Sequence, residues 1–272
     1  MNRSGYRFAI PRRNVQHIVH SSPPAAAAVK FPDYRVCICG TARDISPFFD
    51  KVVSNLRKMV SWFHRSSKIL IVESDSNDTT LALLRGCRDI QTISCGSLEG
   101  MIPLRTHRLA FCRNIYLDFV LTKKSDFDLM IVVDLDDVFA QPISETLFDN
   151  CLLRKTAADW NGVFANQSGR YYDIWALRND EIDFDCIVEN RRSEFQRIIP
   201  NTGELLPVKS AFGGLGIYRT ACLRRGVRYD GIGDKAPEQC EHVSFNCEFS
   251  KLFIDTSMVL QADSFIPNKH LL

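Results

Sequence analysis

The sequence predicts a single α/β domain in which helices cover a central β-sheet. Residues 34–39, 46–65 and 68–72 alternate as strand, amphipathic helix and strand with short connections. This pattern is typical of a βαβ unit, in which the two strands are parallel. The apolar run 129–133 is rich in β-branched residues and bounded by polar ones, as in a strand that is buried on both faces. A chain of 272 residues is long enough for one large domain of this class.

Composition excludes several kinds of partner. The net charge is only +2, so charge alone gives no general affinity for nucleic acid. No apolar run approaches the roughly 18 residues that a transmembrane helix needs. Ten cysteines are spread along the chain without a C-x-x-C pair, which favours buried thiols in a reducing compartment. We therefore expect a cytoplasmic protein, or one of the Golgi or secretory lumen if an anchor is missing from this sequence.

Residues 1–32 differ in composition from the rest of the chain. They contain basic residues, no acidic residue, and the Ser/Pro/Ala-rich stretch 21–28. This composition favours a disordered basic tail or linker over an organelle transit peptide. The folded domain is therefore expected to occupy residues 33–272, and the tail is expected to be dispensable for stability.

Further elements follow from hydrophobic periodicity and from turn residues. The predicted elements are a helix at 79–86, a strand at 90–94, a helix within 100–124, the strand 129–133, strands at 160–165 and 171–177, a helix with a mobile loop in 180–208, and a strand at 212–218. In a parallel arrangement the polar segments that follow strands 68–72 and 129–133 lie at the same edge of the sheet. Ligands bind at this edge in open α/β sheets.

Three carboxylates end the strand 129–133, namely Asp134, Asp136 and Asp137. Like charges at this spacing repel one another unless they are compensated, and a hard divalent cation is the common compensating partner. The alternative is a strand-to-helix turn in which one Asp caps a helix near residues 145–149. Since a cap uses one Asp and seldom three, we interpret the cluster as a metal site.

Four segments, taken in order, resemble one enzyme superfamily. They are residues 72–79 (VESDSNDT), the pair Arg113-Asn114, residues 133–136 (VDLD) and the segment at Gly213-Gly214. Together they resemble the nucleotide-sugar-binding half of GT-A fold glycosyltransferases of the family-2 type, over about residues 35–268. The resemblance implies one domain with a mixed central sheet flanked by helices. Residues 33–140 would form the nucleotide-sugar half and residues 141–272 the acceptor half.

The same resemblance implies a metal-dependent hexosyl- or pentosyltransferase. It would move a sugar from a nucleoside-diphosphate sugar to a hydroxyl group of a glycan or other acceptor. Asp134 and Asp136 would form the D-x-D pair that holds Mn²⁺ or Mg²⁺, and His242 as a third ligand would favour Mn²⁺. The donor-binding residues implied are Thr41, Arg43, Glu73, Asp75, Arg113, Asp134, Gly213 and Gly214.

Catalytic and acceptor-side residues are implied in the second half. Glu241 would be the general base, with Asp136 acting at the metal. Tyr172 and Trp175 would stack on an acceptor sugar, although core packing explains such aromatic residues equally well. Many members of the superfamily carry a Glu-Asp pair where this chain has Cys240, Glu241 and His242. The choice between inverting and retaining chemistry therefore stays open.

Three alternatives remain at the level of the sequence. A haloacid-dehalogenase-like phosphatase would use Asp134 as nucleophile and Asp136 as acid/base, but that motif normally follows the first strand of its fold. A sugar nucleotidyltransferase would need a richer glycine loop than residues 40–43. A non-catalytic sugar-binding module of the same fold would have no need of both D-x-D carboxylates.

Overall fold

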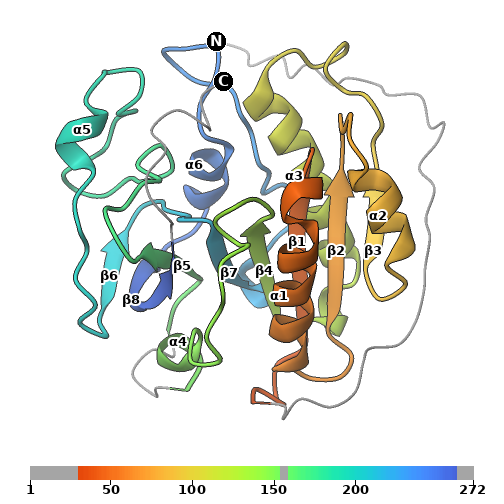
Figure 1. The fold of residues 1–272 in the computed structure, drawn as a ribbon. Coiled ribbons are helices and arrows are strands. Elements are labelled where there is room, and N and C mark those ends of the chain that lie inside the picture. Colours follow the sequence, from red (N-terminus) through yellow and green to blue (C-terminus); the bar gives the residue numbers. More distant parts are fainter. Residues whose placement is uncertain (1–29, 154–158, 262–272) are drawn as a thin grey trace.

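The computed structural model describes residues 30–153 and 159–261. They form one eight-stranded sheet in the order β3-β2-β1-β4-β7-β5-β8-β6 (Figure 1). The strands are β1 (Val36–Ala42), β2 (Lys68–Glu73), β3 (Gln91–Ser94), β4 (Leu129–Asp134), β5 (Gly162–Gln167), β6 (Leu205–Val208), β7 (Leu215–Arg219) and β8 (Leu252–Leu260). The helices are α1 (Phe49–Ser61), α2 (Thr80–Gly86), α3 (Arg105–Thr122), α4 (Asp149–Leu153), α5 (Arg192–Phe195) and α6 (Glu241–Asn246).

The first half of the sheet is parallel, as the sequence predicts. β1 pairs with β2 and β4, and β2 pairs with β3, all in parallel register. Successive residues of β1 face opposite sides, so Ile38 packs in the core layer that contains α1, whereas Cys37 and Cys39 pack in the layer that contains α3. The carboxyl ends of β1, β2 and β4 consequently meet at one edge of the sheet.

The second half makes the sheet mixed. β7 runs antiparallel to both β4 and β5, β8 runs parallel to β5, and β6 runs antiparallel to β8. Residues of α6 pack in the same core layer as residues of α3. The prediction of one domain with a mixed sheet flanked by helices is therefore confirmed.

Several local predictions were wrong. Residues 171–177 contain no strand; their backbone forms turns, with Ile174 N–H donating to the carbonyl of Tyr172 at 2.9 Å. The stretch 180–208 contains the predicted helix, as the one-turn α5, but also the strand β6, which was not predicted. β1 does not end at residue 39, as predicted, but continues to Ala42. A Cβ at Gly40 would lie 2.8 Å from the side chain of Leu135, so this glycine allows a close approach between neighbouring segments.

The predicted tail lies outside the described residues except for its last three positions. For these positions the prediction of disorder was wrong. Phe31 is 2% exposed, stacks on Phe63 with a centroid distance of 5.3 Å, and meets the edge of Phe148. Lys30 forms a salt bridge with Asp149 at 2.6 Å. The packed domain therefore includes residues before the expected boundary at 33.

Two further features bear on the sequence predictions. All ten cysteines are free thiols in the structure, and six of them are buried. Among the described helices, none combines the length and the apolar character that a membrane crossing requires.

Candidate active site

The D-x-D carboxylates lie at the carboxyl end of β4, the fourth strand in sequence. Asp134 is the last residue of β4, and Leu135 is buried in the core, so the side chains alternate between the site and the interior. The partly buried Asp136 accepts a hydrogen bond from the backbone N–H of Val138 at 3.0 Å. Burial, together with the charges of Asp134 and Asp137, raises the pKa of Asp136 to about 7. This cluster therefore carries repulsion that a bound cation would relieve.

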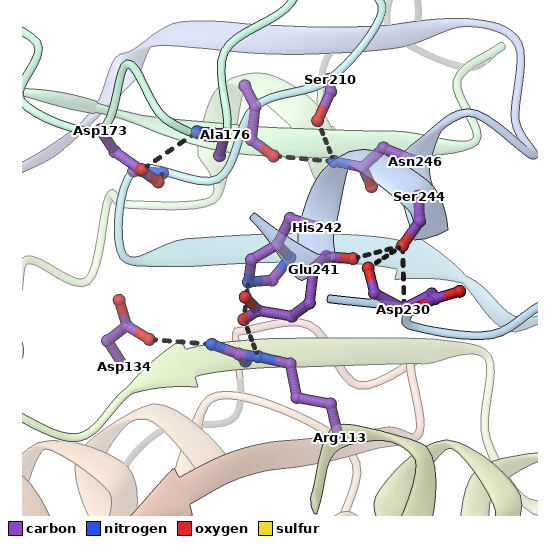
Figure 2. A network of polar contacts seen from close by, with 12 residues as sticks. Arg113, Asp134, Asp173, Ala176, Ser210, Asp230, Glu241, His242, Ser244 and Asn246 are labelled. Atoms are coloured by element: carbon purple, nitrogen blue, oxygen red, sulfur yellow. Dashed lines mark hydrogen bonds and ion pairs between the residues drawn. The ribbon is translucent and has the colours of Figure 1, made fainter. Parts of the chain in front are cut away.

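A buried arginine connects this cluster to the second half of the chain. Arg113, from α3, lies 2.7 Å from Glu241 through Nε and 3.2 Å from Asp134 through Nη2 (Figure 2). Its Nη1 donates to the hydroxyl of Tyr116 at 3.1 Å. Burial by itself would lower the pKa of Arg113, but Tyr116, Glu241 and Asp134 together raise it well above its ordinary value. Arg113 is therefore a permanent cation between two carboxylates.

His242 is buried beside this ion pair. Its ring is 2% exposed and stacks on Phe212 with a centroid distance of 3.8 Å. Neither ring nitrogen has a hydrogen-bond partner among the described residues, and Nε2 lies 3.8 Å from Glu241 Oε1, which is too long for a hydrogen bond. Burial and the charge of Arg113 lower the pKa of His242 well below 6.5. The imidazole is therefore neutral at physiological pH.

The predicted three-ligand metal set is not assembled in this structure. Within residues 30–153 and 159–261, no three His, Cys, Asp or Glu side chains come together as a metal-holding group. Asp134, Asp136 and His242 therefore do not converge in this structure. The physical reason lies in the surroundings of the imidazole, which is held between Phe212 and the Glu241–Arg113 pair.

Two glycines shape the backbone beside Asp134. Gly213 and Gly214 have φ angles of +65° and +83°, a region that favours glycine. A Cβ at Gly213 would lie 2.5 Å from the carbonyl oxygen of Ala165. The carbonyl of Gly214 accepts the backbone N–H of Asp134 at 2.9 Å. The structure thus brings this predicted glycine pair directly to the D-x-D segment.

Asp173 belongs to the same region, although sequence reasoning did not select it. Its Oδ2 accepts the N–H of Gly213 at 2.9 Å, and its Oδ1 accepts the N–H of Ala176 at 3.4 Å. Burial raises its pKa to about 6, and the charges of Asp134 and Glu241 act in the same direction. The one signal in the sequence is an acid inside the aromatic stretch 171–175 (YYDIW).

The two predicted acceptor-side aromatics have different surroundings. A Cβ at Gly214 would lie 3.1 Å from the hydroxyl oxygen of Tyr172, so this phenol lies beside the glycine pair at the D-x-D segment. Burial, together with the charges of Asp134, Asp173 and Asp136, raises the pKa of Tyr172. The indole N–H of Trp175 instead donates to Asp185 at 2.9 Å. Tyr172 therefore lies at the candidate site, whereas the polar end of Trp175 is directed to the 180s segment.

The predicted nucleotide-side residues lie at the ends of β1 and β2. Thr41 is in register with Asp134 across the β1–β4 pair, and Arg43 lies 3.6 Å from Glu99. Glu73 accepts the hydroxyl of Ser94 at 2.6 Å and is only 2% exposed. These residues share one edge of the sheet with the D-x-D segment.

Asp75 is held rigidly at this edge. It has a φ of +57°, and its Oδ1 accepts the N–H groups of Leu98 and Glu99 at 2.7 and 2.9 Å. Its Oδ2 is buried without a hydrogen bond to any described residue, and Arg108 Nε lies 3.7 Å from it. One oxygen thus fixes the loop, and the other faces the guanidinium of Arg108.

Comparisons with known proteins bear on the fold. No family model and no curated protein matches this sequence. The mannosyltransferase PcManGT from Pyrobaculum calidifontis, solved in complex with GDP-Man and Mn²⁺, is 15% identical with a TM-score of 0.51, over 91% of this chain and 62% of that chain. TarS 1–349 from S. aureus is 14% identical with a TM-score of 0.50, over 84% of this chain and 60% of that chain. This chain therefore spans less than two thirds of either structure and has their fold, the GT-A glycosyltransferase fold.

Proposed function

We propose that this protein is a glycosyltransferase that uses a nucleoside-diphosphate sugar and a divalent cation. The observation that carries the proposal is the carboxylate cluster of Asp134 and Asp136 at the carboxyl end of β4. Thr41, Glu73 and Asp75 of this chain lie at the same edge of the sheet. Acidic and polar groups from neighbouring strands thus lie along one edge of the sheet, where ligands bind in open α/β sheets.

The residues present fit Mn²⁺ or Mg²⁺. Both ions accept carboxylate oxygens, and Mg²⁺ is commonly held by one or two carboxylates with the remaining positions filled by water and substrate phosphates. Two carboxylates without a third protein ligand therefore suit a metal that arrives with the diphosphate. PcManGT, which shares the fold, was crystallised with both GDP-Man and Mn²⁺.

The chain's own residues would divide the remaining work. When bound, the cation stabilises negative charge on the departing diphosphate. Asp136 would hold the cation, and Arg113 would fix the orientation of Asp134 through its 3.2 Å contact. Asp75 would hold the loop at the nucleotide side of the site through its hydrogen bonds to the N–H groups of Leu98 and Glu99. The acceptor, a hydroxyl group of a glycan or other molecule, and a cytoplasmic location remain predictions from the sequence.

The phosphatase alternative does not suit this fold. In haloacid-dehalogenase-like enzymes the motif follows the first strand, whereas here Asp134 ends the fourth strand, β4. The Asp134 carboxylate is also paired with Arg113, which weakens it as a nucleophile.

A thermal-shift panel tests the proposal. UDP- and GDP-sugars are added to the protein with Mn²⁺ or with EDTA, and the melting temperature is measured. At about 100 times Kd, a true donor stabilises the fold by about 2.7 kcal/mol, which is a rise of roughly 5–10 °C for a domain of this size. Asp136→Asn should abolish the shift, whereas the exposed Asp126→Asn should leave it unchanged. Equal shifts in Mn²⁺ and EDTA would refute the metal dependence.

A further inference from the structure

We propose that Asp173, rather than Glu241, takes the proton from the attacking hydroxyl group during sugar transfer. The inference rests on the proposed function and assigns one further catalytic residue to it. Three features of the structure support this assignment: the ion pair that occupies Glu241, the surroundings of the Asp173 carboxylate, and the position of Asp173 beside the D-x-D segment.

Glu241 is poorly placed to be a base. Its Oε1 lies 2.7 Å from Arg113 Nε, and the two side chains are 4% and 3% exposed. The guanidinium group of Arg113 thus occupies this oxygen, and a hydroxyl group could reach it only by displacing Arg113. Protonating Glu241 would also leave the guanidinium of Arg113 with Asp134 as its one carboxylate partner in the described chain. The geometry instead makes Glu241 a positioning residue that holds Arg113 against Asp134.

Asp173 has the opposite surroundings. Its carboxylate is held by two backbone N–H groups, those of Gly213 and Ala176, and it forms no salt bridge with any Lys, Arg or His of the described residues. The charged groups that act on it are carboxylates, Asp134 and Glu241. The two N–H bonds lower the pKa of Asp173, but burial and the neighbouring negative charges raise it by more. Asp173 is therefore oriented by the backbone while remaining basic.

Asp173 also lies at the reacting edge of the sheet. Gly213, which donates to it, is followed by Gly214, whose carbonyl accepts the N–H of Asp134. The preceding residue, Tyr172, also lies here, because a Cβ at Gly214 would be 3.1 Å from its hydroxyl oxygen. In Figure 2, Asp134 and Asp173 lie on the same side of Glu241 and His242. Asp173 is thus joined to the D-x-D segment through the Gly213–Gly214 pair, and we expect an acceptor hydroxyl bound at this edge to reach it.

The proposed step is balanced without any further reagent. The hydroxyl oxygen forms a bond to the anomeric carbon while its proton passes to the Asp173 carboxylate. The bond between that carbon and the diphosphate oxygen breaks, and its electron pair leaves with the nucleoside diphosphate. Asp173 then releases the proton to solvent. Water can replace the acceptor hydroxyl, in which case the donor is slowly hydrolysed.

Hydrolysis of the donor provides a test that needs no knowledge of the acceptor. UDP-glucose or GDP-mannose, whichever raises the melting temperature of the wild type, is incubated with Mn²⁺ at saturation, and release of the nucleoside diphosphate is followed. We expect Asp173→Asn to lower the rate about 100-fold or more, the usual contribution of a general base, while the donor-induced thermal shift stays intact. The exposed Asp183→Asn is the matched control and should keep the wild-type rate.

Glu241→Gln separates the two assignments. As a positioning residue, Glu241 should mainly affect melting temperature and donor affinity, and turnover at saturating donor should stay within about 10-fold of wild type. A 100-fold loss of turnover with unchanged donor binding would make Glu241 the base and overturn the proposal. Wild-type turnover in Asp173→Asn would also overturn the assignment of Asp173 as the base. The proposed function would still stand in that case, because it rests on donor binding.

Asp173 also orders the Gly213 segment, so a loss of activity in Asp173→Asn could come from a disturbed fold. Chemical rescue of a second variant separates the two causes. In Asp173→Ala, sodium formate can enter the vacated space and serve as a small carboxylate. Recovery of hydrolysis by at least about 10-fold with formate, and its absence in Glu241→Ala, is the expected result. A donor-binding Asp173→Ala protein that formate does not rescue would contradict the assignment.

Discussion

Replacement of Asp136 by Asn should stabilise the metal-free protein, and more strongly at high pH than at low pH. At pH 8 this carboxyl group is ionised in both the folded and the unfolded chain. A pKa raised from 3.8 to about 7 then costs the folded state about 4 kcal/mol, at 1.36 kcal/mol per pKa unit. The side chain is partly exposed, so solvent screening reduces the cost to about 2 kcal/mol. Asn keeps the acceptor oxygen for the N–H of Val138 and removes the charge.

The sign of the pH dependence follows from proton binding. Because the folded pKa lies above the unfolded one, the folded state of the wild type binds more protons between about pH 4 and pH 7, and this contribution to stability is lost as pH rises. At pH 5 the cost is therefore less than half its value at pH 8, about 0.8 kcal/mol after the same reduction for screening. The variant should gain about 4–8 °C in melting temperature at pH 8 and less than half of that at pH 5.

Calorimetry in EDTA at pH 8 and pH 5 measures this difference, with Asp126→Asn as the control. Saturating Mn²⁺ with the nucleotide should reverse the order at pH 8, because the bound cation stabilises only the wild type. A variant less stable than the wild type in EDTA, or an equal gain at both pH values, would show that repulsion within the cluster is not the cause.

Three further predictions test other parts of the structure. Phe31→Ala should lower the free energy of unfolding in urea by about 3 kcal/mol, since the ring is 2% exposed, whereas the exposed Asp33→Ala should have little effect. The pKa of His242 is depressed, so the wild type should lose about 1.4 kcal/mol of unfolding free energy from pH 7.5 to pH 5.5, because the unfolded histidine gains a proton that the folded one does not. In urea titrations His242→Phe should not show this loss. A variant with the same pH dependence as the wild type would contradict the prediction. Gly40→Ala should lower the melting temperature by several degrees, since its Cβ would lie 2.8 Å from Leu135; an unchanged value would show that Leu135 moves without cost.

Much of the parallel half of the fold could be predicted from the sequence, because each strand there is a short apolar run with turn residues at its ends. β8 was missed because Asp255, Thr256 and Ser257 interrupt its apolar pattern. These polar residues are tolerated through partners elsewhere, such as Asn150, whose amide donates to Asp255 at 2.7 Å. A pattern read over neighbouring positions does not reveal such a partner.

Part of the candidate site could likewise be predicted from the local sequence, and part depends on distant contacts. Asp134 and Asp136 stand out locally, because like charges follow a buried strand. The surroundings of Glu241 depend on Arg113, which is 128 positions away in the sequence. The surroundings of Asp173 depend on the backbone N–H of Gly213, which is 40 positions away. Residue types and spacing thus indicate which groups are present, whereas the basicity of each group is set by tertiary contacts.

The position of β8 in the sheet affects the order in which the protein can assemble. β8 lies between β5 and β6, although both precede it in the chain, and within the described residues β6 pairs with β8 alone. On the ribosome, β1, β2, β3 and β4 can pair as soon as residue 134 has emerged, whereas β6 has no strand to join until residues 252–260 follow. Such long-range pairing is slow, and an unpaired strand is open to association with other chains in the meantime. The half of the sheet that contains β5, β6 and β8 therefore closes last, and substitutions in β8 should act first on the yield of folded protein.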